Sequence, residues 1–431
     1  MNETMNPGAA LTLTHFGAGQ VLNTTAGTVE NGSVTDASAL SAEMKAFYDK
    51  TLITLAGANL VHEQFGQKRP IPKNGGKTIE FRRFSKLPKA LTAITEGVTP
   101  AGNKLNVTGV SCTVDQYGDY IEQTDMLELT AVDNTIIEAT KELAAQAGLT
   151  LDTVVRNELV GGTNVMYAPK VENGTETEIS LRTDITPACK LRVKDVFRAA
   201  AELKAVNAPK INGSYVAIVH PYVAYDLMQE AGDKWIGVAK YVSPENLLKG
   251  EIGTLGGVRF VESTEAKIFA PAEIAGGYPR LTVKTAIESS TTSVVVEEEL
   301  ASASDLSIDC YIGGVANKIT AITAGSGQST LTVQTAISSL AKGAVVCGLG
   351  GGKDGSAVFC TLFLGENAYG VTDVEGGGLQ HIVKQCGYGN DPLNQRSSVG
   401  WKATKVAKRL LEEYMIRFES GSAFSMTAVA N

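Results

Sequence analysis

The chain has 431 residues, of which 43% are hydrophobic, 19% charged and 6% aromatic, a composition that excludes a disordered or collagen-like chain and allows about two to four compact units. Its 38 basic and 46 acidic residues leave a net charge of −8, so the chain as a whole is not an electrostatic binder of nucleic acid. Four histidines, and six cysteines that never form a C-x-x-C pair, argue against an enzyme, a metal site or a cofactor.

Neither a membrane span nor a secretion signal is expected. No stretch reaches the roughly 18 to 20 apolar residues that a span needs. The first residues also lack a basic segment followed by an apolar core. The widely spaced cysteines are therefore interpreted as free thiols in a reducing compartment.

The chain begins with segments of contrasting pattern. Residues 1–40 are rich in Gly, Ala, Thr, Asn and Ser without a sustained period, and are interpreted as an N-terminal arm. Apolar residues then recur at helical spacing, which predicts a helix over residues 41–66. Residues 67–123 follow with turn residues and two alternating runs, at 78–82 and at 105–114. They predict a long two-stranded excursion, which is marginal in water and needs a surface to lie on, such as a neighbouring subunit.

A long helix is the strongest single prediction. An apolar stripe continues from Leu129 to Val155, and Asp125 with Glu128 resembles a capping box. A helix from about Met126 to Val160 would be roughly 50 Å long, with Gly148 as a candidate bend. A kinked pair of ordinary helices is the alternative. This helix places residues 124–214 in one unit.

Strands alternate with helices over residues 215–275, which indicates a mixed α+β unit. The segments Leu281–Ile287 and Leu331–Ile337 then repeat one another, as do Val295–Val296 and Val345–Val346, at an offset of 50 residues. Two copies are too few for a solenoid. Because glycines flank the repeat on both sides, residues 276–353 are interpreted as an inserted β-domain with internal pseudo-symmetry. An apolar strand within 354–375 resumes the interrupted unit, and 376–431 form the C-terminal part.

Charges are segregated along the chain. One acidic residue, Glu80, accompanies eight basic ones: Lys68, Arg69, Lys73, Lys77, Arg82, Arg83, Lys86 and Lys89. Residues 115–138 carry seven acidic residues and no basic one: Asp115, Asp119, Glu122, Asp125, Glu128, Asp133 and Glu138. An extended basic loop and an acidic helix start suggest surfaces that meet between subunits. Two unrelated solvated faces are the alternative.

No motif supports catalysis. The glycine-rich run before Lys353 has Cys347 where a phosphate-binding loop requires glycine, and Asp354 where it requires Ser or Thr. The acidic run at residues 297–299 lacks the pattern of a calcium loop and is interpreted as a solvated surface. His220 stands at a strand end without a partner motif, and Trp401 is interpreted as a packing anchor.

The order of these elements resembles the major capsid proteins of tailed bacteriophages. The local stretches that carry the resemblance are Gly97–Pro100, Gln116–Gly118, Val258–Glu262, Asn367–Gly370, Asp391–Gln395 and Gly400–Lys402. The resemblance implies an α+β capsid fold with an N-arm, an extended β-loop (67–123) and a peripheral domain holding the spine helix (124–214 and 376–431). It also implies an axial domain (215–275 and 354–375) that carries the inserted β-domain.

What the resemblance implies for function is a shell subunit of the virion, assembled in the host cytoplasm. Copies would form pentamers and hexamers of an icosahedral head around double-stranded DNA that they contact non-specifically. The expected protein partners are a scaffold, a portal and a decoration protein. The extended loop would lie across an adjacent subunit, with the basic cluster at the contact with Asp115, Asp119, Glu122, Asp125 and Glu128. No catalytic, cofactor or metal residue is expected. The alternatives are an encapsulin-like shell of a cellular compartment and a surface-layer or adhesin protein.

Overall fold

A computed structural model describes residues 21–24, 27–30, 33–36, 60–84, 87, 89–91, 93, 96–97, 102–130, 135–172, 174–232, 235–237, 250–384, 393 and 395–431. The chain divides into two compact units. The first comprises Met1–Leu60, Lys68–Val154 and Val371–Ala407, and the second comprises Val61–Gln67, Val155–Gly370 and Lys408–Asn431.

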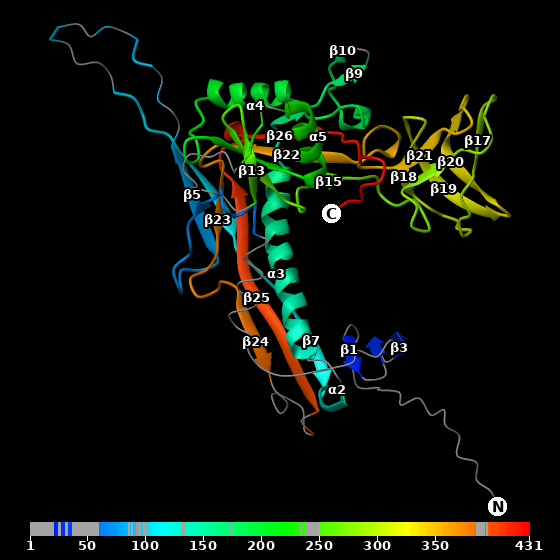
Figure 1. The fold of residues 1–431 in the computed structure, drawn as a ribbon, viewed down its shortest axis with the longest axis horizontal. Coiled ribbons are helices and arrows are strands. Elements are labelled where there is room, and N and C mark those ends of the chain that lie inside the picture. The colour runs from blue at the N-terminus through cyan, green and yellow to red at the C-terminus, as the bar shows by residue number, and fades with distance from the viewer. Residues whose placement is uncertain are drawn as a thin grey trace, which may run out of the picture. The chain divides into compact units, whose positions relative to one another are not determined.

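The first unit is built on a mixed sheet with the strand order β3-β2-β1-β7-β25-β23-β4, in which β24 also pairs with β25 (Figure 1). Its strands are β1 (Val21–Thr24), β2 (Gly27–Glu30), β3 (Ser33–Asp36), β4 (Gln67–Lys68), β7 (Asp115–Thr124), β23 (Tyr369–Thr372), β24 (Gln380–Lys384) and β25 (Arg396–Arg409). Strands β7 and β25 are antiparallel in an unbroken register from Asp115 opposite Lys405 to Thr124 opposite Arg396.

One face of this sheet is covered by α3 (Thr135–Val160). Leu143, Ala144, Ala147 and Leu151 of the helix pack against Val399, Trp401 and Ala403 of β25, with Tyr117 and Ile121 of β7 beside them. The alanines let the helix backbone approach the sheet closely. Since side chains alternate along a strand, the odd-numbered residues of β7 and β25 face α3 and the even-numbered residues form the opposite, outer face.

A separate two-stranded hairpin joins β5 (Thr78–Phe84) to β6 (Val107–Thr113). Its register runs from Thr78 opposite Thr113 to Phe84 opposite Val107. Both alternating runs of the sequence therefore lie in strands, and they pair with each other.

The second unit contains a mixed sheet with the order β12-β13-β14-β11-β22-β26-β8, and β15 pairs with β22. The strands are β8 (Val165–Tyr167), β11 (Tyr215–Val219), β12 (Ile236–Gly237), β13 (Glu251–Leu255), β14 (Val258–Glu262), β15 (Ile268–Phe269), β22 (Val358–Leu364) and β26 (Met415–Ser420). Every residue of β11 and β22 is buried, as the continuous apolar runs of both segments predict.

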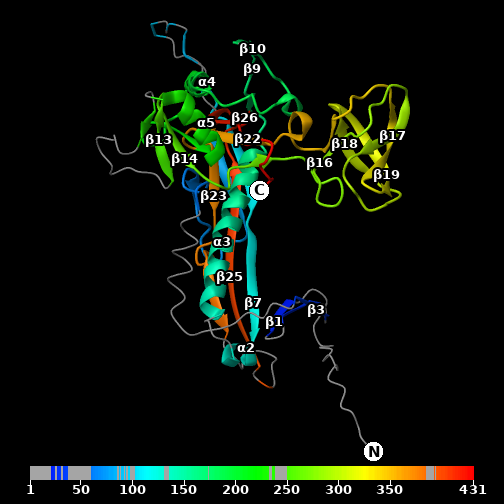
Figure 2. The same cartoon turned by 45° about the vertical axis from the view of Figure 1, so that its right-hand side comes forward.

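Helices α4 (Val193–Ala205) and α5 (Pro221–Ala231) belong to the same unit (Figure 2). It also holds the 3₁₀ turns η1 (Arg182–Asp184), η5 (Lys353–Gly355) and η6 (Glu412–Tyr414) and the strand pair β9 (Lys170–Glu172) and β10 (Thr175–Thr177). Pro221 is the first helical residue of α5 and Gly232 ends it, as the sequence predicts.

The residues between β15 and β22 form a six-stranded sheet of their own, with the order β16-β21-β18-β19-β20-β17. Its strands are β16 (Arg280–Thr282), β17 (Thr291–Val296), β18 (Ile308–Ile312), β19 (Val315–Gly325), β20 (Gln328–Ile337) and β21 (Val345–Gly348). The two end strands meet: the Lys284 amide donates to the Val295 carbonyl at 2.9 Å, and the Glu297 amide donates to Thr282 at 2.9 Å. The sheet is thereby closed into a barrel without free edges.

Pairing inside the barrel crosses the sequence repeat. Leu281 of the first copy lies opposite Val346 of the second, and Leu331 of the second lies opposite Val294 of the first. Each copy's first strand therefore pairs with the other copy's second strand. The two copies form one body, because both strands of the first copy, β16 and β17, also pair with a strand of the second.

Several predicted boundaries differ from the structure. Of the predicted long helix, the structure describes α2 (Asp125–Thr130) and α3, and residues 131–134 lie outside the described residues. The hydroxyl of Thr124 accepts from the Leu127 amide at 3.3 Å, so the cap lies one residue before the predicted Asp125. Within the predicted arm, three short strands pair as β1–β2 and β2–β3. Most of the predicted helix over 41–66 lies outside the described residues, and residues 62–65 form turns.

Candidate assembly interface

The basic cluster lies along β4, the turns between β4 and β5, β5 itself and the segment that follows β5. Lys68, Arg69, Lys73, Lys77, Arg82 and Lys89 are exposed, Arg83 is half-buried, and Lys86 lies outside the described residues. The turn before β5 depends on Asn74, which adopts a φ of 68°, a conformation that asparagine tolerates better than most residues. The excursion therefore presents its positive charges to the surroundings.

The β5–β6 hairpin has an apolar and a polar side. Phe81 and Cys112 are buried on one side, whereas Arg82 is on the other, opposite Gly109. The Glu80 carboxylate lies over Gly109, where a Cβ atom would meet it at 1.9 Å. Arg82 is therefore flanked by the one acidic residue of the basic cluster.

The acidic residues do not share one face of β7. Asp115 and Asp119 are odd-numbered and lie on the face toward α3, whereas Glu122 is on the outer face. Asp125 begins α2, where its carboxylate accepts from the Met126 amide at 2.8 Å. The Glu128 side chain lies outside the described part of the structure. The acidic segment thus divides between two surfaces.

Asp119 is held in place by a chain of hydrogen bonds. Gln146 of α3 donates from Nε2 to Asp119 Oδ2 at 2.6 Å and accepts from Trp401 Nε1 at 3.1 Å. The indole is buried and its N–H is satisfied, so Trp401 is a packing anchor. Sequence reasoning did not identify Gln146, because only the register of α3 against the sheet brings it to Asp119.

A groove lies on the outer face of the sheet, where β7, β25 and β24 adjoin. Its cavity volume is about 520 Å³, and its lining includes Gly118, Tyr120, Glu122, Ile382, Lys384 and Gly400. Tyr120 lies opposite Gly400, where a Cβ atom would come within 2.7 Å of the Cβ of Tyr120. The glycine is therefore required for this close approach. We call this hollow the Gly400 groove.

His220 and the glycine-rich run before Lys353, the candidates for catalysis and phosphate binding, have structural roles. His220 Nδ1 accepts from the Tyr222 amide at 3.2 Å and caps α5, and burial lowers the pKa of His220 to about 4. In the glycine-rich run, the Gly352 and Lys353 amides donate to the carbonyls of Ser356 and Ile185. They do not converge on a vacant phosphate position.

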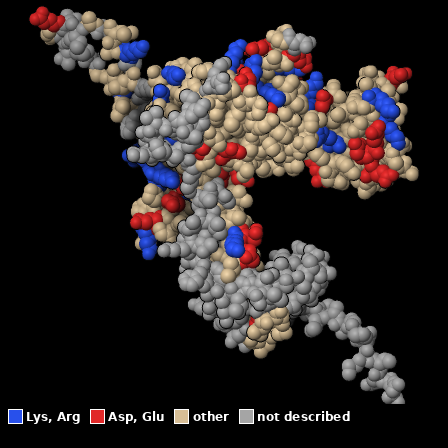
Figure 3. All heavy atoms as spheres, viewed as in Figure 1, with Lys and Arg blue, Asp and Glu red and all other residues tan. Residues whose placement is uncertain are grey.

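Carboxylates of the acidic run at residues 297–299 accept hydrogen bonds from backbone amides of the barrel. Glu298 accepts from the Thr282 amide with both carboxylate oxygens at 2.9 Å, and Glu299 accepts from the Gly327 amide. Figure 3 shows acidic and basic side chains interspersed on the barrel.

No group of three or more His, Cys, Asp or Glu with metal-binding geometry occurs within the described ranges. Among the helices placed there, none is long and apolar enough to cross a membrane.

Comparisons with solved structures identify the fold. The capsid of Ralstonia phage GP4 is similar to this chain with a TM-score of 0.53 and 12% sequence identity, over 91% of this chain and 96% of that one. This chain has the tailed-phage capsid fold. The capsid of cyanophage P-SCSP1u is also similar, with a TM-score of 0.48 and 12% identity over 88% of this chain and 91% of that one. No family model matches the sequence, and a search of the curated proteins finds no match.

This assignment confirms the α+β capsid fold predicted from the order of segments. It does not depend on sequence identity, which is only 12% for the GP4 capsid. The capsid fold spans both units, because 91% of the chain is covered.

Proposed function

We propose that this protein is the major capsid subunit of a tailed-phage head. Copies assemble as pentamers and hexamers of an icosahedral shell that encloses double-stranded DNA. The observation that carries this proposal is the likeness to the GP4 capsid over nearly the whole length of both chains. The role is structural, so no residue is assigned to catalysis.

The described surface of the first unit suits repeated contact between copies. The β5–β6 segment is extended and basic, and it ends in exposed apolar residues such as Leu87, Leu91 and Leu105. Strand β7 carries exposed carboxylates at Asp115 and Asp119. Individual exposed ion pairs contribute only about 0 to 1 kcal/mol. The charges therefore act on the register and rate of association more than on its strength.

The partners expected of such a subunit are a scaffold during assembly, a portal, a decoration protein and the packaged DNA. The encapsulin-like alternative predicts a co-purifying cargo protein, whereas the phage proposal predicts DNA inside mature particles. Nuclease-protected DNA in particles from an infected host separates the two.

Charge reversal at the basic cluster tests the proposal. In the Arg82→Glu/Arg83→Glu variant, assembly should fall at least about tenfold, which corresponds to about 1.4 kcal/mol. Assembly is measured as the fraction of protein sedimenting as particles. The subunit itself should stay folded, because Arg82 is exposed and Arg83 only half-buried.

Lys104→Glu is the matched control, since Lys104 is exposed in the same excursion but lies outside the basic cluster. It should assemble like the parent protein. Equal loss of assembly and of the circular dichroism signal in the double variant would show that the cluster is structural. Unchanged assembly would remove it from the interface.

A further inference from the structure

Strand β8 lies at one end of the sheet of the second unit, and its outer edge is unpaired. Only alternate residues of this run bond to β26: Asn164 accepts through its carbonyl and Ala168 donates through its amide, each at 2.9 Å. The backbone N–H and C=O groups of Val165 and Tyr167 therefore point away from β26. Within the described part of the chain, no hydrogen bond reaches these four groups. Such an edge is a template for a further strand.

A groove runs along this edge. Two hollows, of about 470 and 240 Å³, adjoin one another, because Asn164 and Glu202 line both of them. Together they follow the chain from Thr163 to Pro169, which as an extended run spans roughly 20 Å. Helix α4 contributes Arg198, Glu202, Ala205 and Val206 to the lining. An extended segment of a few residues therefore fits beside β8, and we call this hollow the β8 groove.

The charges that line the β8 groove favour a basic occupant. The lining carries one cation, Arg198, and four carboxylates: Glu178, Glu202, Glu412 and Glu413. The Arg198 guanidinium is 3.9 Å from the Glu178 carboxylate and 3.7 Å from that of Glu202, and all three side chains are exposed. Because exposed pairs contribute only about 0 to 1 kcal/mol, an incoming cation can replace Arg198. A hydrogen bond from the Thr163 hydroxyl lowers the pKa of Glu412, so this carboxylate is ionised at neutral pH.

We propose that the β8 groove binds a basic, extended segment of a partner protein, which joins the sheet as a strand beside β8. The outward backbone groups of Val165 and Tyr167 bind the backbone of this segment. Its Lys or Arg side chains at alternate positions lie roughly 6.6 Å apart on one face and reach carboxylates such as that of Glu202. The inference goes beyond the proposed function, because it concerns a partner other than a second copy of this chain.

Hydrogen exchange on the full chain tests the edge directly. The probe is the peptide acetyl-Thr-Lys-Val-Lys-Val-Lys-Thr-amide, which alternates cations with a strand-forming residue. In excess, it should slow exchange of the Val165 and Tyr167 amides at least about tenfold, since both amides become hydrogen-bonded. The same peptide with Glu in place of each Lys should leave their exchange unchanged.

Two variants separate the backbone contact from the charge contact, each measured by fluorescence anisotropy of the labelled basic peptide. Val165→Pro removes an outward N–H and spares the bonds to β26, a position at which edge strands tolerate proline. It should weaken binding at least about tenfold, whereas Val165→Ala should bind like the parent. Glu202→Lys should weaken binding to a similar extent. Glu288→Lys, at an exposed position of the barrel, is its matched control and should bind normally.

Several results would overturn the inference. Unchanged exchange at Val165 and Tyr167 with the basic peptide, or equal slowing with the acidic one, would show that the edge does not select a basic strand. If these amides instead become protected as the concentration of the chain alone rises, a second copy occupies the edge. Should Val165→Pro lose the circular dichroism of the parent, Glu202→Lys decides: normal binding by that variant rejects the site. All these results leave the capsid proposal standing, because particle formation tests it separately.

Discussion

His220 shows how a residue with catalytic chemistry is used for structure. Its ring is 4.8 Å from that of Tyr222 and 5.2 Å from that of Phe359, measured between centroids. Its Nδ1 caps α5, which requires an unprotonated nitrogen. Burial lowers the pKa of His220 to about 4, so the folded protein keeps this cap at neutral pH.

This cap predicts a specific loss of stability in acid. The unfolded chain binds a proton at His220 below about pH 6.5, whereas the folded chain resists it until about pH 4. The free energy of unfolding should therefore fall by about 3 kcal/mol over that interval. In His220→Asn, which caps without titrating, the fall measured by urea unfolding should be smaller by that amount. Identical pH profiles would contradict the assignment of the cap.

Individual residues also show which features of the candidate interface can be predicted from the sequence and which cannot. The excess of acidic residues in 115–128 is visible in the sequence, but their division between two faces follows from the parity of Asp119 and Glu122 within β7. That parity could have been read from the alternation with Tyr117 and Ile121. The pairing of Tyr120 with Gly400 at the groove could not, because the two positions are far apart in sequence and only the β7–β25 register brings them opposite each other.

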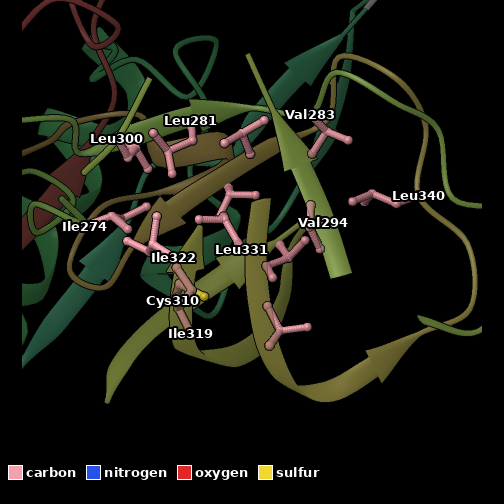
Figure 4. Close-up of a cluster of buried hydrophobic side chains, with 14 of the residues drawn as sticks. Ile274, Leu281, Val283, Val294, Leu300, Cys310, Ile319, Ile322, Leu331 and Leu340 are labelled. Carbon is pink, nitrogen blue, oxygen red and sulfur yellow. The ribbon is translucent and has the colours of Figure 1, made fainter. Parts of the chain in front are cut away.

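At the scale of elements, the barrel is the clearest case. Its core is a separate apolar cluster in which Leu281, Val294, Cys310, Ile319 and Leu331 point toward one another (Figure 4). Burial raises the pKa of the Cys310 thiol to about 11, so this cysteine stays protonated as part of the core. The sequence predicted the inserted module and its repeat. It did not predict that β16 pairs with β21 and β17 with β20, because pairing within one half of the repeat and pairing between the two halves satisfy the same alternation of side chains.

The separate core predicts a local effect of mutation. Leu331 is fully buried, and Leu331→Ala should destabilise the barrel by about 2 to 5 kcal/mol, through lost burial and a cavity. Hydrogen exchange should accelerate in β17 and β20, while amides of β22 and β26 keep their protection. Val315→Ala, at a position 69% exposed, should change little. Uniform loss of protection across both sheets would show that the barrel does not unfold independently.

At the scale of the whole molecule, the order of segments predicted the fold where no single motif did. The buried strands β11 and β22, the helix over 135–160 and the return after the insertion each had a local signal in composition or period. The start of α2 had a signal in Asp125 and Glu128, which placed the cap one residue later than Thr124. Because an interface depends on how surfaces of different copies meet, the residues of the proposed interface could be predicted only as charged segments, not as contacts.

Negative-stain electron microscopy of the purified full-length chain tests the central claim most directly. If the protein is a capsid subunit, closed shells or rings of five and six subunits should form under assembly conditions, with a scaffold supplied if the chain alone stalls as free capsomers. A protein that stays monomeric under every assembly condition, with the circular dichroism of a folded chain, would contradict the account.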